Sequence, residues 1–267
     1  MNYYKVTIQY EGTHYSGLQW QQGLKTVQDE FNKALAQLIE GKITTTSASR
    51  TDSGVHALMQ IMKVTSSCAI DKEYFCIQIN KLLPADIRSL KIENCASSFK
   101  PSVDSLSKEY RYLFTNKSKV SLTDMQFISN ISNTLDFDEM KKCISMLKGI
   151  YDFQNFYSAG SNVKSTIRNI ISCELTEINP HTIFENLELF KIPTSVDHCY
   201  ELKIVANGFL KQMIRHLVSA LWMVGSQKIT SDEFQVFLSG PKVLKQRWKV
   251  APPNGLFLFQ IVYAPAK

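Results

Sequence analysis

Alternation of apolar and polar positions in the first half of the chain predicts a repeating set of strands and helices. Residues 4–10 alternate every second position, which is typical of a half-buried strand. Thr26-Val27-Gln28-Asp29 has the pattern of a helix start, and apolar residues then recur on one helical face until Gly41. By the same criteria we expect strands at 43–49, 58–64, 90–98 and 109–115 and a helix at 71–82.

The second half repeats this mixture after a polar stretch, 116–134, that lacks a clear period and is interpreted as a connection. We expect helices from Asp136, at 209–224 and at 231–238, and strands at 166–175, 200–205 and 256–262. The predicted fold is α+β, with two similar halves, 1–115 and 135–267, each a mainly antiparallel sheet with helices on one face.

Composition excludes several classes of protein. The 267 residues are 44% hydrophobic and 20% charged, as in ordinary globular proteins, and no apolar run approaches the roughly 20 residues that span a membrane. No secretory signal is recognisable, and six cysteines without a C-x-x-C pair indicate free thiols in a reducing, cytoplasmic setting rather than zinc ligands. The net charge of +6 permits an anionic partner without requiring one.

The loop at 50–56 carries the strongest chemical signal. Its sequence Arg-Thr-Asp-Ser-Gly-Val-His places a carboxylate, Asp52, between two predicted strands. Asp-Ser-Gly is by itself a good turn sequence, because Asp bonds its own backbone and Gly tolerates positive φ. An isolated motif of this kind would therefore indicate a turn before it indicated an active site.

The loop together with its following alanine resembles the R-T-D-A-G-V-H-A signature of the tRNA pseudouridine synthase A family, with Ser53 as its one difference. Further segments resemble the family in the same order. They are Tyr10-Glu11-Gly12 with Gly17, Thr26-Val27-Gln28, Lys108-Glu109-Tyr110-Arg111-Tyr112, Arg168-Asn169-Ile170, the segment 207–215 that ends on Arg215, and Pro252-Pro253-Asn254-Gly255-Leu256. Leu18, His216 and Ser219 depart from the family pattern, which leaves substrate range and helix packing open.

The resemblance implies that Asp52 is the catalytic carboxylate of an isomerase that converts uridine to pseudouridine without metal or organic cofactor. Asp52 could attack the sugar, attack the base or act as a base, and the sequence does not choose among these routes. A buried carboxylate needs a cationic partner, for which we predict Arg215, on a polar helix stripe with Lys211 and Ser219. Tyr110 is expected to stack on the target base, although its alternating strand would also suit a plain core residue.

A base within a folded RNA must leave its stack before this chemistry can occur. Arg50 resembles the arginine that assists this step in the family, and His56 is a weaker candidate. Phosphate contacts are expected from basic residues near aromatic ones, although a solvated surface has the same composition. The predicted RNA-binding residues are Arg50, His56, Lys108, Arg168, Lys211 and Arg247, the last within a basic cluster with Lys242, Lys245 and Lys249.

By resemblance, the partner is tRNA, the target lies at uridines 38–40 of the anticodon stem-loop, the RNA lies in a cleft between the halves, and the protein is a homodimer. Three alternatives stay open. The chain could bind RNA without chemistry, modify a different RNA, or hydrolyse RNA with Asp52 and His56, which would change the mass of the product.

Overall fold

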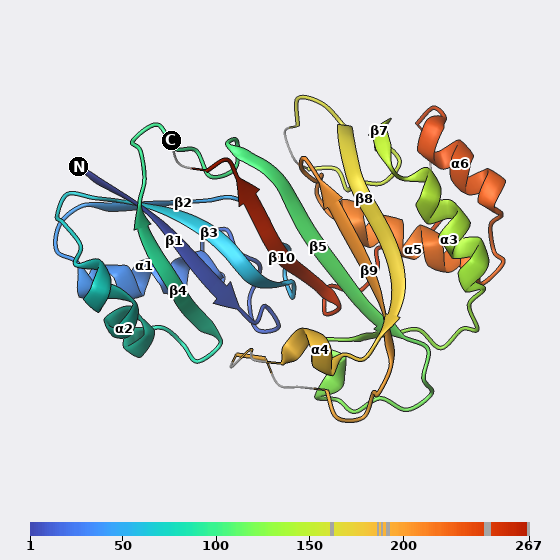
Figure 1. Ribbon diagram of the computed structural model, residues 1–267, viewed down its shortest axis with the longest axis horizontal. Coiled ribbons are helices and arrows are strands. Elements are labelled where there is room, and N and C mark those ends of the chain that lie inside the picture. Colours follow the sequence, from blue (N-terminus) through green and yellow to red (C-terminus); the bar gives the residue numbers. More distant parts are fainter. Residues whose placement is uncertain (161–162, 186, 188, 191–192, 243–246, 266–267) are drawn as a thin grey trace. The chain divides into compact units, whose positions relative to one another are not determined.

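A computed structural model describes residues 1–265 except 161–162, 186, 188, 191–192 and 243–246 (Figure 1). The chain forms two compact units. Unit 1 comprises Met1–Leu106, Asn186–Lys191 and Phe257–Lys267, and unit 2 comprises Ser107–Glu185 and Ile192–Leu256. None of the helices in the described part of the chain is long and apolar enough to cross a bilayer.

The strands of unit 1 follow the order β4-β1-β3-β10, with β2 also paired to β3. Their bounds are β1 Asn2–Tyr10, β2 Ile43–Ser47, β3 His56–Ser66, β4 Ile87–Asn94 and β10 Leu256–Tyr263. β1 pairs antiparallel with β3 and β4, and β2 pairs antiparallel with the end of β3. β10 meets the start of β3 in parallel, with Phe257 opposite His56, so the last strand of the chain joins the first unit.

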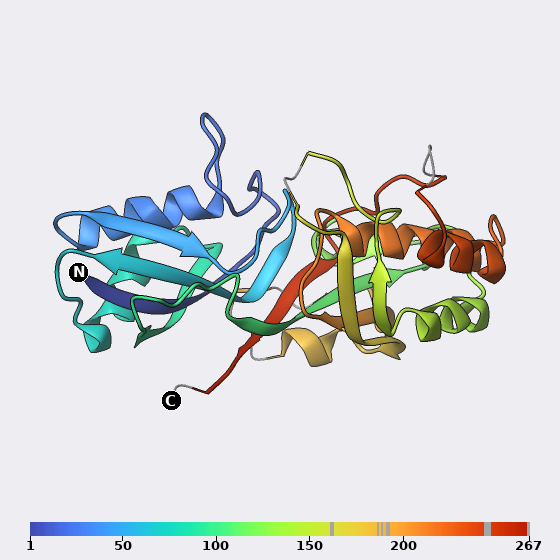
Figure 2. The same cartoon turned by 90° about the horizontal axis from the view of Figure 1, so that it is seen from above.

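Two helices pack side by side on one face of this sheet, α1 Val27–Leu38 against β2 and α2 Lys72–Leu82 against β4. Figure 2 shows α1 lying along β2. The side chain of Thr26 caps α1 by accepting from the Asp29 N–H, and Asp71 caps α2 in the same way. The apolar faces are fully buried, with Phe31 and Leu35 on α1 and Phe75 and Ile79 on α2.

In unit 2 the strand order is β5-β9-β8-β7, all antiparallel, with the short strand β6 parallel to β5. The strands are β5 Ser105–Thr115, β6 Ser129–Asn130, β7 Gly149–Asp152, β8 Ile167–Ile178 and β9 Cys199–Ala206. The helices are α3 Phe137–Met146, α4 His181–Phe184, α5 Met213–Gly225 and α6 Ser231–Ser239, with a 3-10 turn at Asp124–Gln126. Rings of Tyr112 and Phe114 on β5 meet Trp222 edge-on, which packs α5 against the sheet.

The predicted mixed α/β class is confirmed, and the strongly periodic elements form close to their expected bounds. The boundaries of the two units differ from those of the predicted halves, 1–115 and 135–267. The stretch 116–134 is part of unit 2, since Phe114 and Thr115 pair with Ser129 and Asn130 and the Asp124 carboxylate accepts from the backbone of Thr194 and Ser195.

Helix α5 begins at Met213, four residues later than the predicted start at 209, because Gln212 adopts a left-handed conformation with φ 59°. The expected stripe of Lys211, Arg215 and Ser219 is therefore wrong in two of its members. Lys211 precedes the helix and is exposed, whereas Ser219 is buried.

Candidate active site

The loop that joins β2 to β3 in unit 1 holds Asp52. Arg50 is exposed, Asp52 is half-buried, and the Val55 N–H donates to the Asp52 carbonyl over 3.2 Å, which closes a tight turn. Gly54 supplies the positive φ of 77° that this turn requires. The turn interpretation and the active-site interpretation of Asp-Ser-Gly are thus compatible, because the turn is what fixes the carboxylate in space.

A cradle formed by residues 10–18 holds this loop. The hydroxyls of Tyr10 and Thr51 share a buried hydrogen bond of 2.7 Å, and the Leu18 N–H donates to the Thr51 carbonyl over 3.2 Å. The Tyr15 carbonyl accepts from the Ser53 hydroxyl at 3.0 Å. Burial raises the pKa of Tyr10 to about 12, so its hydroxyl stays neutral. Leu18, which departs from the family pattern, is fully buried here as part of the cradle.

Two glycines allow the cradle to approach the loop backbone. A Cβ on Gly12 would lie 1.9 Å from the Val55 carbonyl oxygen, and a Cβ on Gly17 would lie 2.7 Å from the Thr51 carbonyl oxygen. Gly17 also has a φ of +94°, which an L side chain rarely adopts. Any side chain at these positions must displace the loop that carries Asp52.

We expect Gly17→Ala to destabilise the fold by about 1–3 kcal/mol, from the left-handed backbone and the forced shift of the loop. Because a displacement of about 1 Å in a catalytic group can cost roughly a hundredfold in rate, turnover should fall more than stability alone explains. Thermal unfolding and single-turnover rates measure both effects.

Gly23→Ala is the matched control for this substitution. Gly23 has a φ of +75°, but no atom of the described residues lies within 4 Å of the position that a Cβ would take, so the variant carries the backbone penalty without the clash. If both variants lose turnover equally, the close approach of Gly17 does not position the loop.

Gln60 on β3 supports the loop from the other side. Its amide donates to the Ser49 carbonyl at 2.7 Å, and its side-chain oxygen accepts from the Ser49 N–H at 3.3 Å. The side chain thus continues the pairing of β2 with β3 beyond the last strand residue. Gln60 is not among the predicted site residues, although a polar residue among the apolar positions of this strand is a visible signal.

His56 lies in the core and not at the surface. Its ring is 0% exposed, stacks on Phe257 at 4.7 Å, and meets Phe190 edge-on at 6.0 Å. Its Nδ1 accepts from the Gly12 N–H at 3.1 Å, so this nitrogen carries no proton. The burial does not fit the expected RNA contact, and it also disfavours the hydrolase that would pair His56 with Asp52. We assign His56 a positioning role between the cradle and the loop.

Tyr110 is on β5 in unit 2. Its side chain is 5% exposed, and Phe209 meets its ring edge-on at 5.1 Å, with an interplanar angle of 80°. A contact of this kind sets the edge of one ring against the face of the other and holds the plane of the Tyr110 ring. Burial and packing agree with the interpretation of Tyr110 as a core residue, and its stacking on a target base stays a prediction.

Arg215 lies in the first turn of α5 and is half-buried. Its Nε donates to the Ala251 carbonyl at 2.7 Å, and the Ala251 N–H donates back to the Arg215 carbonyl at 3.3 Å. The following segment is fixed in turn, because the Tyr112 hydroxyl donates to Pro252 and the Leu113 N–H donates to Gly255. Ala251, directly before the Pro-Pro-Asn-Gly-Leu motif, thus holds the guanidinium through its carbonyl, and the motif anchors this segment to β5.

His216, the next residue, is buried and belongs to a separate network. Ser158 donates its hydroxyl proton to Gln212 Oε1 at 2.5 Å and lies 2.9 Å from His216 Nε2. The single hydroxyl proton of Ser158 is used in the bond to Gln212, so the Ser158 oxygen accepts from His216. His216 therefore carries its proton on Nε2 and none on Nδ1. Desolvation, followed by the charge of Arg215, lowers the pKa of His216 to about 4, which keeps the ring neutral at physiological pH. This departure from the family pattern therefore adds no charge beside Arg215.

Two of the predicted RNA-binding residues lie near each other on unit 2. Lys108 on β5 is 8% exposed, and burial, with a smaller contribution from the positive charge of Arg168, lowers the pKa of its ammonium to about 8. Burial also lowers the pKa of Arg168, whose guanidinium donates to the carbonyls of Ser165 and Ile167. A phosphate beside them would stabilise both cations.

The remaining basic candidates are less distinctive. Arg247 is exposed and pairs with Glu233 at 2.5 Å. Lys211 is exposed, with its ammonium 3.6 Å from the position a Cβ would take on Gly160. Lys245 of the basic cluster lies outside the described residues. Charge pairing makes Arg247 a weaker candidate for a phosphate contact than Lys108 and Arg168.

Comparison with known proteins agrees with these local features. The family model described as tRNA pseudouridine synthase matches residues 6–100 and 143–264, which include the Asp52 loop and Arg215. Proteins named tRNA pseudouridine synthase A from Bacillus pumilus and a Thermoanaerobacter species are 32% and 34% identical over 261 residues, 97% of this chain and 98% of each relative. One from Caldicellulosiruptor bescii is 31% identical over 258 residues. The chain belongs to the tRNA pseudouridine synthase family of isomerases.

Proposed function

We propose that this protein isomerises uridine to pseudouridine in the anticodon stem-loop of tRNA, at positions 38–40. The observation that carries the proposal is the Asp52 loop, which is held on both sides by the cradle and by Gln60 within the part of the chain that matches the family. Such support is what a catalytic carboxylate needs, because its position must not relax when charge develops on the substrate.

The reaction breaks the bond between ribose and a ring nitrogen and forms one between ribose and a ring carbon, so the product has the mass of the substrate. In this proposal Asp52 is ionised and reacts with the sugar or the base, or removes a proton from the ribose. Tyr110 supports the everted base, and Arg215 stabilises the Asp52 carboxylate. The two units contribute Asp52 and Arg215 separately, so this pairing stays a prediction.

Mapping pseudouridine in a defined transcript tests the proposal. The purified protein is incubated with an unmodified tRNA transcript, and pseudouridine is located by chemical derivatisation and mass spectrometry of fragments. We expect conversion at positions 38–40 without release of base or phosphate. Conversion elsewhere would assign a different RNA target, a product of altered mass would favour a hydrolase, and binding without conversion would indicate an RNA-binding protein.

Arg50 is the proposed base-flipping residue, because it is exposed and lies two residues before Asp52. Extrusion costs a few kcal/mol of stacking and pairing, which a side chain in the vacated space offsets. We expect Arg50→Ala to slow conversion of a paired target, and a substrate whose target uridine is already unpaired should recover much of the rate. An equal defect on both substrates would remove the flipping role.

Phosphate contacts are proposed for Lys108, Arg168, Lys211 and Arg247. We rank Lys108 and Arg168 first, because both are partly or largely buried, whereas Lys211 is exposed and Arg247 is paired with Glu233. We also propose that two copies of the chain act together on tRNA in the cytoplasm. Light scattering of the purified protein, alone and with tRNA, distinguishes a dimer from a monomer.

A further inference from the structure

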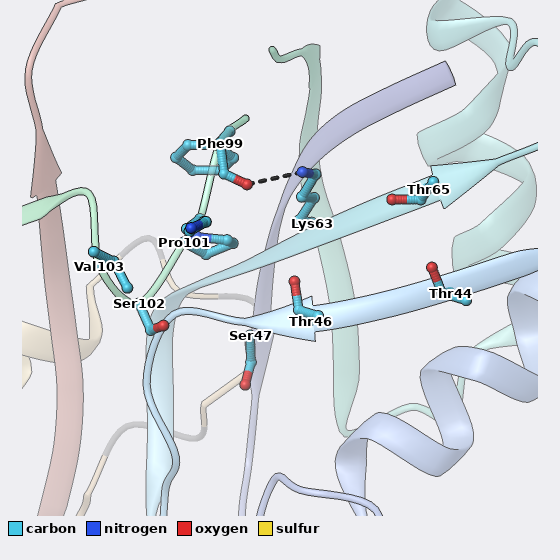
Figure 3. Close-up of a pocket in the computed structure, with 10 residues that line it drawn as sticks. Thr44, Thr46, Ser47, Lys63, Thr65, Phe99, Pro101, Ser102 and Val103 are labelled. Carbon is cyan, nitrogen blue, oxygen red and sulfur yellow. Dashed lines mark hydrogen bonds between the residues drawn. The ribbon is translucent and has the colours of Figure 1, made fainter. Parts of the chain in front are cut away.

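A groove with a volume of about 330 Å³ lies on unit 1, on the sheet face away from α1 (Figure 3). Its floor is made by β2 and β3 and its wall by residues 99–103. This volume lies at the lower end of the range for ligand pockets and suits a group of about the size of one nucleotide. The described residues that line it include none of the predicted site residues.

Strand register places a row of hydroxyl groups on the groove floor. Thr44 pairs with Thr65 and Thr46 with Lys63, so these four side chains share one face. The intervening Thr45 points to the other face, where its hydroxyl donates to Asn32 of α1 at 2.7 Å. The Thr-Thr-Thr-Ser sequence of β2 therefore divides its hydroxyls between helix support and the groove.

The wall of the groove is fixed before any ligand arrives. The Lys63 ammonium donates to the carbonyls of Ser97 and Phe99 at 2.7 and 2.8 Å, the second of which is drawn in Figure 3. The Tyr263 hydroxyl donates to the Pro101 carbonyl at 2.8 Å. A preformed wall lowers the conformational cost of binding.

The charge within the groove is positive. Among the described residues that line it, Lys63 and Lys100 are charged and none is a carboxylate, while nearby Asp104 accepts from the Lys100 backbone N–H at 2.8 Å. In the described part of the chain, Lys63 forms no ion pair. Its two hydrogen bonds go to neutral carbonyls, so they do not neutralise its positive charge. The Lys63 ammonium also lies 5.0 Å from the centre of the Tyr3 ring, so Lys63 adds positive charge to the groove, while Lys100 and the threonine hydroxyls are the groups offered to an anion.

We propose that this groove binds a backbone phosphate of tRNA, on the strand that leads to the target nucleotide. Ser47 lines the groove, and Asp52 follows it after five residues, which limits their Cα separation to about 18 Å. The exposed side chain of Val103, 71% accessible, gives an apolar rim for the adjoining ribose or base. The inference rests on tRNA as the proposed substrate. It adds a contact between tRNA and the protein outside the reacting centre.

Salt dependence of tRNA binding tests this assignment. Lys100→Gln should weaken binding about threefold to tenfold at moderate salt and reduce the slope of log affinity against log salt by about one. Thr44→Val combined with Thr46→Val removes two hydroxyls but keeps β-branched side chains, and we expect roughly fivefold weaker binding with nearly the same slope. The maximal rate at saturating tRNA should stay unchanged for both variants.

Lys81→Gln on α2 is the matched control, because it removes the same charge from the helix-covered side of unit 1. An unchanged salt slope in Lys100→Gln, or an equal change in Lys81→Gln, would overturn the proposal. A change in self-association instead of tRNA binding would do so as well and would assign the groove to a second copy of the chain. Since binding is measured without turnover, absence of pseudouridine would count against the proposed function and leave the groove result interpretable.

Discussion

Replacing Asp52 by alanine is expected to abolish pseudouridine formation while leaving tRNA binding within a few-fold of normal. Every route considered for the reaction uses the carboxylate, so its loss should lower the single-turnover rate by about 10⁴-fold or more, at or beyond the upper end of acid–base contributions. Asp52→Asn should be nearly as inactive, because it keeps the shape of the side chain and loses the charge. Single-turnover assays with labelled tRNA, together with filter binding, separate the two effects.

Ser53→Ala is the appropriate control for this experiment. It changes the neighbouring residue of the same turn, removes one hydrogen bond to the Tyr15 carbonyl, and makes the loop match the family signature. Loss of one such bond costs about 1 kcal/mol, so the rate should change little. Equal pseudouridine yields from Asp52→Ala and the unmodified protein would remove Asp52 from the mechanism.

Arg215→Ala is expected to lower the maximal rate by roughly 10²–10³-fold, the effect typical of losing a positioned charge at a reacting centre. The Ala251 carbonyl fixes the guanidinium from one side through Nε, which leaves a planar, oriented cation. Arg215→Lys should restore only part of the rate, since an ammonium cannot reproduce both the backbone contact and the planar geometry. Steady-state assays give the maximal rate and the KM for tRNA.

Arg247→Ala provides the contrast, because Arg247 is exposed and already paired with Glu233. We expect this variant to change the KM slightly and the maximal rate not at all. If Arg215→Ala behaves in the same way, with a normal rate and weaker binding, Arg215 is a phosphate contact and not a partner of the catalytic carboxylate.

Local elements follow directly from the sequence where a single period and its end signals agree. Thr26 begins α1 as expected, α2 begins one residue after the predicted 71 because Asp71 is its cap, and the alternating strand 4–10 forms β1. The predicted start of α5 is wrong because the apolar pair Phe209 and Leu210 extends the apolar pattern ahead of the helix, and nothing in that pattern reveals the left-handed backbone of Gln212. The spacing of apolar residues indicates which face of a helix they occupy, but it does not indicate at which residue the helix begins.

The sequence by itself determined the mixed α/β class and singled out the loop around Asp52, because both depend on residues that are neighbours in the chain. The tertiary structure alone decided that His56 is a core residue, that Gln60 braces the loop, and that β10 returns to the first unit. These features depend on contacts between residues that are 11 positions apart for Gln60 and Ser49 and about 200 apart for His56 and Phe257. Such contacts form only when burial of the whole core makes one arrangement more stable than the others, and no local pattern encodes that choice.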